Sequence, residues 1–551
     1  MKKKLLALSI TLALGLSSSL YAQTSSSIRG VITGPEGEPA AGTSITIIHV
    51  PSGTTSSVST NQNGVFNASG LRVGGPYRLD VTNSEFQNRT INDIYLNLDD
   101  HFALNLALEP GQAIESITVT ASSLSGTSGS SGPAAQFNLN DLELAPSFNR
   151  SLNDVIRSDP RIYIDETFSD SIQCAGANPR FNSLTLDGVR MNDNFGLNSN
   201  GYPTERMPFS FDAIQQVAVQ FAPFDAKFGG FTACNINAVT KSGENQIYGG
   251  VFYDFNSDAL KGDSLRGVDI DAGDFDEKRY GANLGLPLIK DTLFLFGAYE
   301  KVEGVSQFNY PALGGLISQA DASRISEISS RVYNFDAGSF PASLPVEDEK
   351  LLLRLDWNIN QDHRASFVYN YNDGLNISQS DRFAQALTFS STFYERGATL
   401  ESVVASLYSD WNSSFSTELR IGRAELENLQ NSLESDSGFP EVQIRVGSGT
   451  AFVGPDDSRQ SNDLNWDNLT VRLAGSYDLG NHLISGGFEH EKLNVFNLFM
   501  QHTVGEYGFN SIADFELGKA SSVYYGNSAG TNNPDDAAAS FSYSINSAYV
   551  Q

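Results

Sequence analysis

The clearest pattern in the chain is an alternation of apolar and polar side chains over residues 351–373. Apolar residues hold every second position in 351–359, the alternation resumes after the polar turn 360–363, and only Leu352 and Val368 break it. Because a strand turns successive side chains to opposite faces, each arm has one apolar and one largely polar face. Each arm also has roughly the 9 to 11 residues that a tilted strand needs to cross a bilayer core. The stretch predicts a β-hairpin, which suits either a soluble sandwich or a membrane barrel.

Repetition of this alternation along residues 244–551 favours the barrel. Short turns and long polar segments also take turns along the same region, as they do in outer-membrane barrels, where the short turns are periplasmic and the long loops are outside. The short turns lie at 289–291, 360–363, 412–414 and 479–482, and the long segments lie near 303–348, 373–398, 428–465 and 501–540. We therefore expect a transmembrane antiparallel β-barrel over 244–551.

The first residues have the features of a secretory signal peptide. Three lysines, Lys2 to Lys4, precede an apolar run over 5–16, and a stretch of mostly small residues ends at Ala22. We expect cleavage after Ala22. The mature protein then begins at Gln23 and lies outside the cytoplasm.

Residues 23–110 alternate short β-prone segments with turns rich in glycine, asparagine and proline, which predicts a small β-sandwich. The order of landmarks resembles the carboxypeptidase regulatory-like domain, which is not itself catalytic. These landmarks are Gly30, Gly42, Gly64, Leu71 and Tyr77. His49 and His101 lack the helical spacing and glutamate partner of a zinc peptidase site, so we interpret them as ordinary surface or strand histidines.

Residues 111–135 form the predicted linker. Its Ser/Gly-rich part, 122–132, has the composition of a flexible tether. The segment 114–121 before it is rich in β-forming residues. It is either the last strand of the preceding domain or an exposed segment that adds a strand to another protein's sheet.

The resemblance becomes specific after residue 150. Four motifs are similar to the plug domain of TonB-dependent outer-membrane receptors, namely those at 151–160, 182–191, 211–219 and 228–243. Together with the barrel motif at 286–300, they resemble the Oar-like branch of these receptors. The fold expected is mostly β: an N-terminal β-sandwich, an α+β plug over 136–243, and a barrel.

This resemblance implies partners and a place in the cell. The segment 114–121 is similar to the TonB box, which comprises Ile114, Glu115, Ser116, Ile117, Thr118, Val119, Thr120 and Ala121. TonB and its inner-membrane energising complex would be the periplasmic partners, with the N-terminal domain in the periplasm. The barrel would lie in the outer-membrane lipid of a Gram-negative bacterium and bind an extracellular ligand. The lumen-facing row is polar, so we expect a wet interface between plug and wall.

The only two cysteines, Cys174 and Cys234, both fall in the expected plug, and in an oxidising compartment they suggest a disulfide, with two buried thiols as the alternative. The Asn/Gly-rich loop 191–207 favours tight turns and is either a recognition loop or a loop braced against the wall. In the family the apical plug loops face the ligand. The expected ligand-side residues are Asn192, Asn194, Asn198, Asn200 and Tyr202.

Composition narrows the function further. The net charge of −29 argues against a nucleic-acid partner, because phosphate binding depends on clustered cations. We find no metallopeptidase, phosphate-loop or nucleophile-elbow motif. We therefore expect no enzyme, no catalytic residue, no cofactor and no metal. Residues 269–277 are acidic enough to hold Ca²⁺ but lack the EF-hand register, so a solvated loop is the preferred interpretation.

The number of strands predicts an incomplete barrel. We count about ten candidate strands, including 541–551, which is near half of the 22 strands of a plugged transporter barrel. A half barrel would leave two unpaired edges in lipid. We therefore expect a partial barrel and a chain that is a fragment of a longer protein. The leading hypothesis is ligand transport across the outer membrane. The alternatives are a surface-binding or adhesion protein with a structural barrel, and a soluble accessory of a carboxypeptidase.

Overall fold

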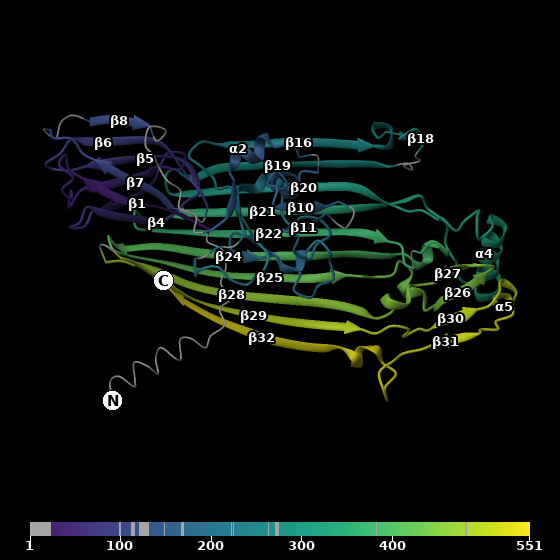
Figure 1. Ribbon diagram of the computed structural model, residues 1–551. Helices are drawn as coiled ribbons and strands as arrows, with labels where there is room; N and C mark the ends of the chain where they lie inside the picture. The colour runs from purple at the N-terminus through teal and green to yellow at the C-terminus, as the bar shows by residue number, and fades with distance from the viewer. Residues whose placement is uncertain are drawn as a thin grey trace, which may run out of the picture.

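The computed structural model describes residues 24–98, 101–111, 116–120, 132–147, 149–166, 170–221, 223, 225–262, 264–269, 275–381, 383–479 and 482–551. The predicted signal peptide and most of the acidic run 269–277 lie outside the described residues. In Figure 1 an N-terminal domain lies at one end of a long curved sheet, and a smaller unit of strands and helices lies at the other end. None of the helices in the described part of the chain is long and apolar enough to span a membrane.

The N-terminal domain is a sandwich of two sheets, with strand orders β4-β1-β7 and β3-β2-β5-β6-β8. Alternate residues of its strands point inward and form a buried apolar core that includes Ile28, Ile45 and Leu79. This confirms the predicted β-domain. The strands are β1 (Ser26–Thr33), β2 (Ser44–His49), β3 (Thr54–Ser59), β4 (Val65–Leu71), β5 (Gly74–Thr82), β6 (Asn88–Leu96), β7 (His101–Ala107) and β8 (Ser116–Thr120).

The plug region is a five-stranded sheet of order β13-β12-β15-β14-β9, flanked by the hairpin β10–β11 and two short helices. Helix α3 begins where the Ser151 side chain accepts a hydrogen bond from Asn153 N, and Pro160 follows its end. The elements are β9 (Ala134–Phe137), α2 (Leu139–Leu144), α3 (Leu152–Ile156), β10 (Ile162–Asp165), β11 (Ser171–Cys174), β12 (Ser183–Leu186), β13 (Val189–Arg190), β14 (Ile214–Gln220) and β15 (Asn235–Thr240).

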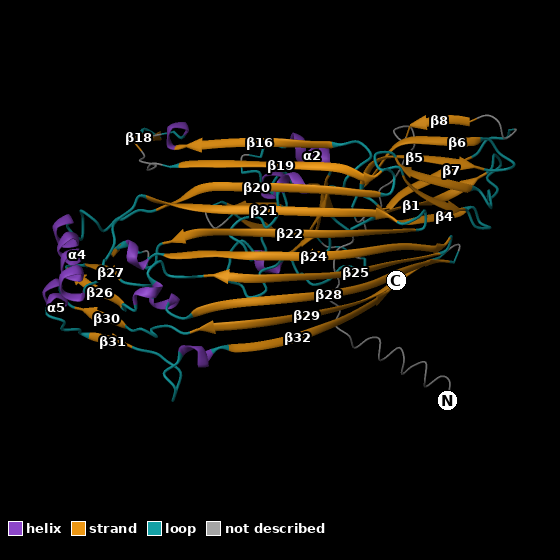
Figure 2. Cartoon of the chain, turned by 180° about the vertical axis from the view of Figure 1, so that it is seen from behind, coloured by secondary structure: helices purple, strands orange, loops and turns teal. Residues whose placement is uncertain are grey.

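The long sheet has ten antiparallel strands in the order β16-β19-β20-β21-β22-β24-β25-β28-β29-β32, and it does not close on itself. Figure 2 shows it curving along the length of the molecule. The partial barrel that the sequence predicts is confirmed. Its strands are β16 (Tyr248–Ser257), β19 (Asp276–Ile289), β20 (Leu293–Gln307), β21 (Ser343–Asn358), β22 (His363–Ser378), β24 (Tyr394–Asn412), β25 (Phe415–Leu429), β28 (Asn462–Asp478), β29 (Leu483–Phe499) and β32 (Ala539–Val550).

The two faces of this sheet differ as the alternation predicts. Leu353, Trp357 and Phe367 are exposed on the outer face, whereas Asp356 and Asn370 are buried on the inner face. Leu352 and Val368, which break the alternation in the sequence, are also buried on the inner face, where they pack against the plug. The inner face is therefore mixed rather than wholly polar, and the expectation of a wet interface is corrected on this point.

The long segments between strands fold into a compact unit, which we call the loop domain. It contains a sheet of order β23-β27-β26-β30-β31, and its buried core draws on four separate segments. The pattern of polar segments predicts loops there and misses these elements. They are α4 (Gln319–Tyr333), β23 (Ala386–Thr388), β26 (Glu441–Val446), β27 (Gly449–Val453), β30 (Glu506–Phe509), α5 (Ile512–Glu516) and β31 (Ser522–Tyr524), and a small hairpin, β17 (Ser264–Leu265) with β18 (Val268–Asp269), precedes β19.

A charge placed on the outer face tests which solvent that face meets. We expect Leu353→Arg, near the middle of the apolar band, to destabilise the folded protein in a bilayer by about 2–4 kcal/mol. Ile359→Arg lies in the turn after β21 and replaces a similar apolar side chain, so its cost should be about 1 kcal/mol or less. Urea titration in lipid vesicles, read from the folded band on unheated gels, measures both. Equal costs for the two variants would contradict a lipid-facing outer surface.

Candidate functional site

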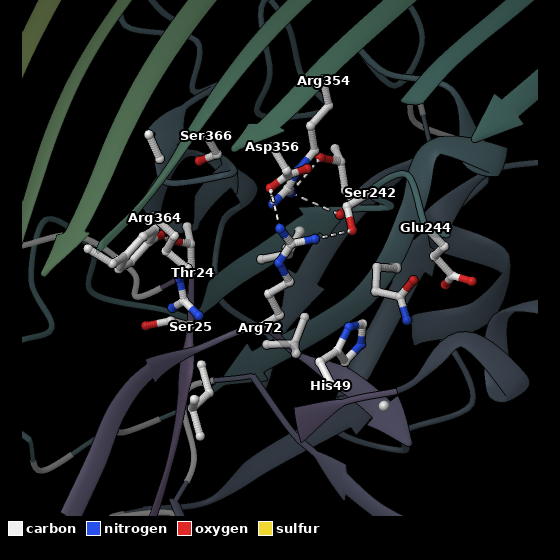
Figure 3. A pocket seen from close by; sticks show the side chains of 18 residues that line it. Thr24, Ser25, His49, Arg72, Ser242, Glu244, Arg354, Asp356, Arg364 and Ser366 are labelled. Atoms are coloured by element: carbon white, nitrogen blue, oxygen red, sulfur yellow. Dashed lines mark hydrogen bonds and ion pairs between the residues drawn. The ribbon is translucent and has the colours of Figure 1, made fainter. Parts of the chain in front are cut away.

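The plug packs against the inner face of the long sheet. A single buried apolar cluster contains plug residues such as Ile156 and Val217 together with wall residues such as Phe296, Leu352 and Leu400. Polar contacts surround this cluster, and the densest of them lie where the N-terminal domain, the plug and the wall meet. Figure 3 shows this junction.

Arg354 of β21 joins the wall to the plug at the junction. Its Nη1 donates to Thr240 O at 3.0 Å and to Asp187 Oδ1 at 3.2 Å, both on the plug. Its Nε and Nη2 donate to the Asp356 carboxylate, at 2.8 and 3.0 Å, on the wall itself. Asp187 is positioned by the two-residue turn between β12 and β13, in which both Asp187 and Gly188 have positive φ, as a type I′ turn requires. One guanidinium therefore binds two carboxylates in different parts of the protein.

Arg72 brings the N-terminal domain into the same network. It donates to Ser242 Oγ at 3.1 Å and to Asn358 Oδ1 at 3.2 Å, and it lies 3.9 Å from Asp356. In Figure 3 the side chains of Arg72 and Arg354 approach Asp356 from opposite sides. The N-terminal domain is thus docked onto both the plug and the wall.

A cavity of about 50 Å³ remains beside these side chains, lined in part by His49, Glu244 and Arg364. This volume suits water rather than a transported ligand, because one water molecule takes about 30 Å³ of liquid volume. Burial, with the positive charges of Arg72 and Arg364 nearby, lowers the pKa of His49 to about 3. His49 is therefore neutral at physiological pH, and its Nδ1 is bonded to Ser52 Oγ at 2.7 Å. This part of the junction therefore joins the domains without leaving room for a transported ligand.

Several wall charges are neutralised by a neighbour two positions away on the same strand and face. Arg279 pairs with Glu277, Lys350 with Asp348, Arg354 with Asp356, and Arg420 with Glu418. The sequence analysis did not single out these pairs. Their signal is an opposite charge at i and i+2 on the polar row of a strand, because i and i+2 share a face.

The predicted ligand-side residues divide into two groups. The side-chain amides of Asn192 and Asn200 donate hydrogen bonds within the plug, to Asn182 O at 2.6 Å and to Thr204 O at 3.0 Å. Tyr202 is buried. Asn198 accepts a hydrogen bond from Arg396 of β24 at 2.7 Å, and Asn194 is half-buried. The exposed groups at this loop are instead Phe195 and Leu197, at 39% and 38%. Two apolar residues flanking Gly196 in a polar loop were the signal that could have indicated them.

The TonB-box-like segment is placed as a strand. Ser116–Thr120 forms β8, which pairs in parallel with β6 at the edge of the N-terminal sheet, with Val119 opposite Ile91. This is the first of the two interpretations that the sequence left open. Ile114, Glu115 and Ala121 lie outside the described residues.

Cys174 and Cys234 are joined by a disulfide, with their Cα atoms 6.0 Å apart. Cys174 ends β11, and Cys234 directly precedes β15. The bond therefore links the β10–β11 hairpin to the central strand of the plug sheet.

Two groups of acidic residues in the loop domain, one of which includes a histidine, have ligand atoms close enough together to hold a cation. These groups are Asp381 with Glu441 and Asp456, and Asp457 with His502 and Glu506. Burial, together with the charges of Asp381 and Asp457, raises the pKa of Glu441 to about 9, so this group keeps a proton at neutral pH. His502 Nδ1 lies 3.2 Å from both carboxylates of its own group. Asp456 is also paired with Arg459 at 3.1 Å, and we assign no metal to either group.

The chain matches two domain families and a known transporter. The carboxypeptidase regulatory-like domain matches residues 27–109, and an outer membrane beta barrel domain matches residues 310–551. The TonB-dependent transporter Oar of Myxococcus xanthus is 28% identical over 211 residues, which are 34% of this chain and 18% of Oar. The chain is a homologue of the TonB-dependent transporter Oar. It belongs to the outer membrane of a Gram-negative bacterium, as the sequence analysis expects.

A solved outer membrane transporter has a fold similar to that of this chain. The outer membrane transporter YddB from Escherichia coli matches with a TM-score of 0.52 at 12% identity, over 74% of this chain and 52% of YddB. The siderophore receptor PirA from Acinetobacter baumannii matches with a TM-score of 0.45 at 14% identity, over 67% of this chain and 49% of PirA. The chain thus spans about half the length of the solved structures that it matches.

Removing Arg354 from the Oar homologue tests the wall-to-plug link. We expect Arg354→Ala to destabilise the folded protein by about 3–5 kcal/mol, because it leaves buried carboxylates without their partner. Arg423→Ala breaks an exposed ion pair with Glu425 on β25 and should cost about 1 kcal/mol or less. Urea midpoints measured in vesicles compare the two variants. If Arg354→Ala were as stable as Arg423→Ala, the link would not hold the plug.

The pKa of His49 predicts acid sensitivity of the N-terminal domain. The folded pKa of about 3 lies below the ordinary value of 6.5, so the unfolded chain binds the proton more readily between these pH values. The stability that the neutral imidazole contributes is complete above pH 6.5 and is lost as the pH falls toward 3. Calorimetry should show the Tm of this domain falling over that window, and His49→Gln should flatten the fall. A decline that is unchanged in His49→Gln would assign the effect to other groups.

Proposed function

We propose that this chain acts in an outer-membrane transporter that binds an extracellular ligand and moves it past a plug, using energy delivered by TonB from the inner membrane. The observation that carries this proposal is the plug itself. It lies on the inner face of the sheet and is attached to the wall by discrete polar contacts such as those of Arg354. A barrel that served only as an anchor would have no use for a domain that blocks its interior.

The two ends of the molecule support an orientation. Short turns, such as the one after β21, lie beside the N-terminal domain, and the loop domain lies at the opposite end (Figure 1). Outer-membrane barrels have their short turns in the periplasm. The N-terminal domain and β8 would therefore face the periplasm, where TonB could reach them, and the loop domain would face the exterior.

The ligand would enter from the loop-domain side. Phe195 and Leu197 expose apolar surface at the plug loop, and Arg396 braces that loop through Asn198. Ligand bound there would contact both plug and wall, so binding could change how the plug is held. The protein would act without chemistry on the ligand, as expected of a homologue of a transporter.

TonB would bind by strand addition. β8 is an edge strand, and its backbone groups on the side away from β6 can pair with a strand of another protein. An alternative function, surface binding or adhesion, is favoured by the loop domain, which has a core of its own.

Deleting residues 114–121 separates these two functions. If TonB delivers energy through this segment, the deletion should abolish uptake, measured as growth of a receptor-deficient strain on ferric siderophores, peptides or glycans offered singly. The adhesion of labelled cells to a surface should stay unchanged, because adhesion does not need this segment. Deleting 123–130 in the linker removes the same number of residues and should leave uptake close to that of the intact protein. Growth that survives the loss of 114–121 would favour the adhesion function.

A further inference from the structure

The disulfide divides the plug into two parts that are held in different ways. The leading part, residues 134–173, contains β9, α2, α3 and β10, and it precedes Cys174 in the chain. The trailing part runs from 175 to 243 and contains Cys234. Because the bond connects β11 to the start of β15, it lies at the boundary between the two parts.

The trailing part is fixed to the wall at many points along its length. Its polar contacts with wall strands come from the turn at Asp187, the loops around 198 and 205–210, and the end of β15. They join Asp187 and Thr240 to Arg354, Asn198 to Arg396, Glu205 to Asn376 and Arg396, Pro208 O to Asn370, and Ser210 to Glu300. Strands β20, β21, β22 and β24 all take part, so no single contact has to carry a load.

The leading part shares the apolar cluster through residues such as Leu152 and Ile156, but its polar contacts differ from those of the trailing part. β9 is an edge strand that pairs with β14 through four residue pairs. Arg150 lies over the Phe252 ring of β16, 3.6 Å from its centroid, but its ion pair is with Asp212 of the plug. Glu143 is likewise paired with a plug residue, Lys241. Arg150 and Glu143 are therefore paired with the rest of the plug rather than with the wall, and Gln136 Nε2 donates to Leu98 O of the N-terminal domain at 2.9 Å.

We propose that the Cys174–Cys234 bond sets the limit of plug extraction, so that force from the N-terminal side unravels residues 134–173 and stops at Cys174 while the trailing part stays on the wall. This inference rests on the proposed function for the origin of the force. The transport path would then open by removal of the leading part, beside β16, and the trailing part would keep its place for return.

The path that the pulling force takes through the chain explains why unravelling would stop at Cys174. Tension that reaches Cys174 passes through the disulfide into Cys234 and does not enter the 60-residue loop that the bond closes. Cys234 adjoins β15, the central strand of the sheet, which is paired on both sides with β12 and β14. Breaking two ladders together with the Arg354 contacts demands more force than peeling one edge strand. At about 3.5 Å per residue, residues 134–173 extend to roughly 140 Å before this point.

Single-molecule force measurement on the full chain in lipid vesicles tests the limit directly. A handle attached through a click-reactive residue at Gly132 keeps the N-terminal domain out of the load path. With the bond intact, the first release should end near 140 Å, followed by a rise in force. In Cys174→Ser/Cys234→Ser, and in the unaltered chain under thiol reductant, the same pull should release about 200 Å more, the contour of the 60-residue loop.

Ser171→Ala/Ser183→Ala is the matched control. It alters two buried serines near the bond, on β11 and β12, and keeps the disulfide, so its first release should equal that of the unaltered chain. Equal release lengths in the oxidised and reduced forms would overturn the proposal. Detachment of the entire oxidised plug from the wall in a single step would also overturn it. The measurement needs neither TonB nor a ligand. Its failure would therefore count against the disulfide limit alone, whereas the deletion of 114–121 tests the proposed function alone.

Discussion

Hydrocarbon offers no hydrogen-bond partner, and the rest of this structure depends on that constraint. Every backbone amide and carbonyl of a membrane-crossing strand must pair with a neighbouring strand. The pairing produces strands such as β21 and β24 that run well beyond the width of a bilayer and continue toward the loop domain. It also produces two faces, one apolar and one largely polar. The polar face then needs its own partner, and the plug supplies one.

The plug meets that face with a mixture of apolar packing and ion pairs. Phe296 and Leu352 enter the core of the plug, whereas Arg354 binds its DG turn. Apolar contacts alone would hold the plug against the wall but would do little to fix its orientation. Charge without packing would leave cavities and costly burial. Apolar packing and ion pairs together fix the position of the plug on the wall. The contacts that hold it there are nevertheless separate from one another.

The sequence predicts the elements whose signal is local and fails where the partner is distant. The alternation through Leu353 and Trp357 predicts the barrel strands, because period two follows from strand geometry alone. The loop domain was missed because Ile325, Leu387, Ile444 and Phe515 come from four separate segments that meet only in the fold. Helix α4 does carry a helical period, at Ala322, Ile325 and Ile328, whereas the strands of the loop domain are short. At the site, Arg354 stands in a predicted polar row, but nothing in the sequence near it indicates Asp187 or Arg72. The high β-propensity of β8 fits either an exposed segment or an edge strand. Propensity alone therefore could not distinguish these two interpretations.

If the plug moves as proposed, the charge pairs within wall strands limit the unpaired charge that its movement would leave in the lumen. If Asp187 departs, Arg354 keeps the Asp356 carboxylate, because both side chains lie on β21. Asp187 in turn keeps the hydrogen bonds from Thr240 N and Oγ1, which travel with it on the plug. Lys350, Asp348 and Glu300 form a second charged group, and it lies wholly on the wall. At the Arg354 site each surface keeps partners for its own charge, so separation costs mainly the cross-contacts. Elsewhere, as between Glu205 of the plug and Arg396 of the wall, separation would break an ion pair. Charge pairing within a strand would thus lower the cost of the plug movement proposed above.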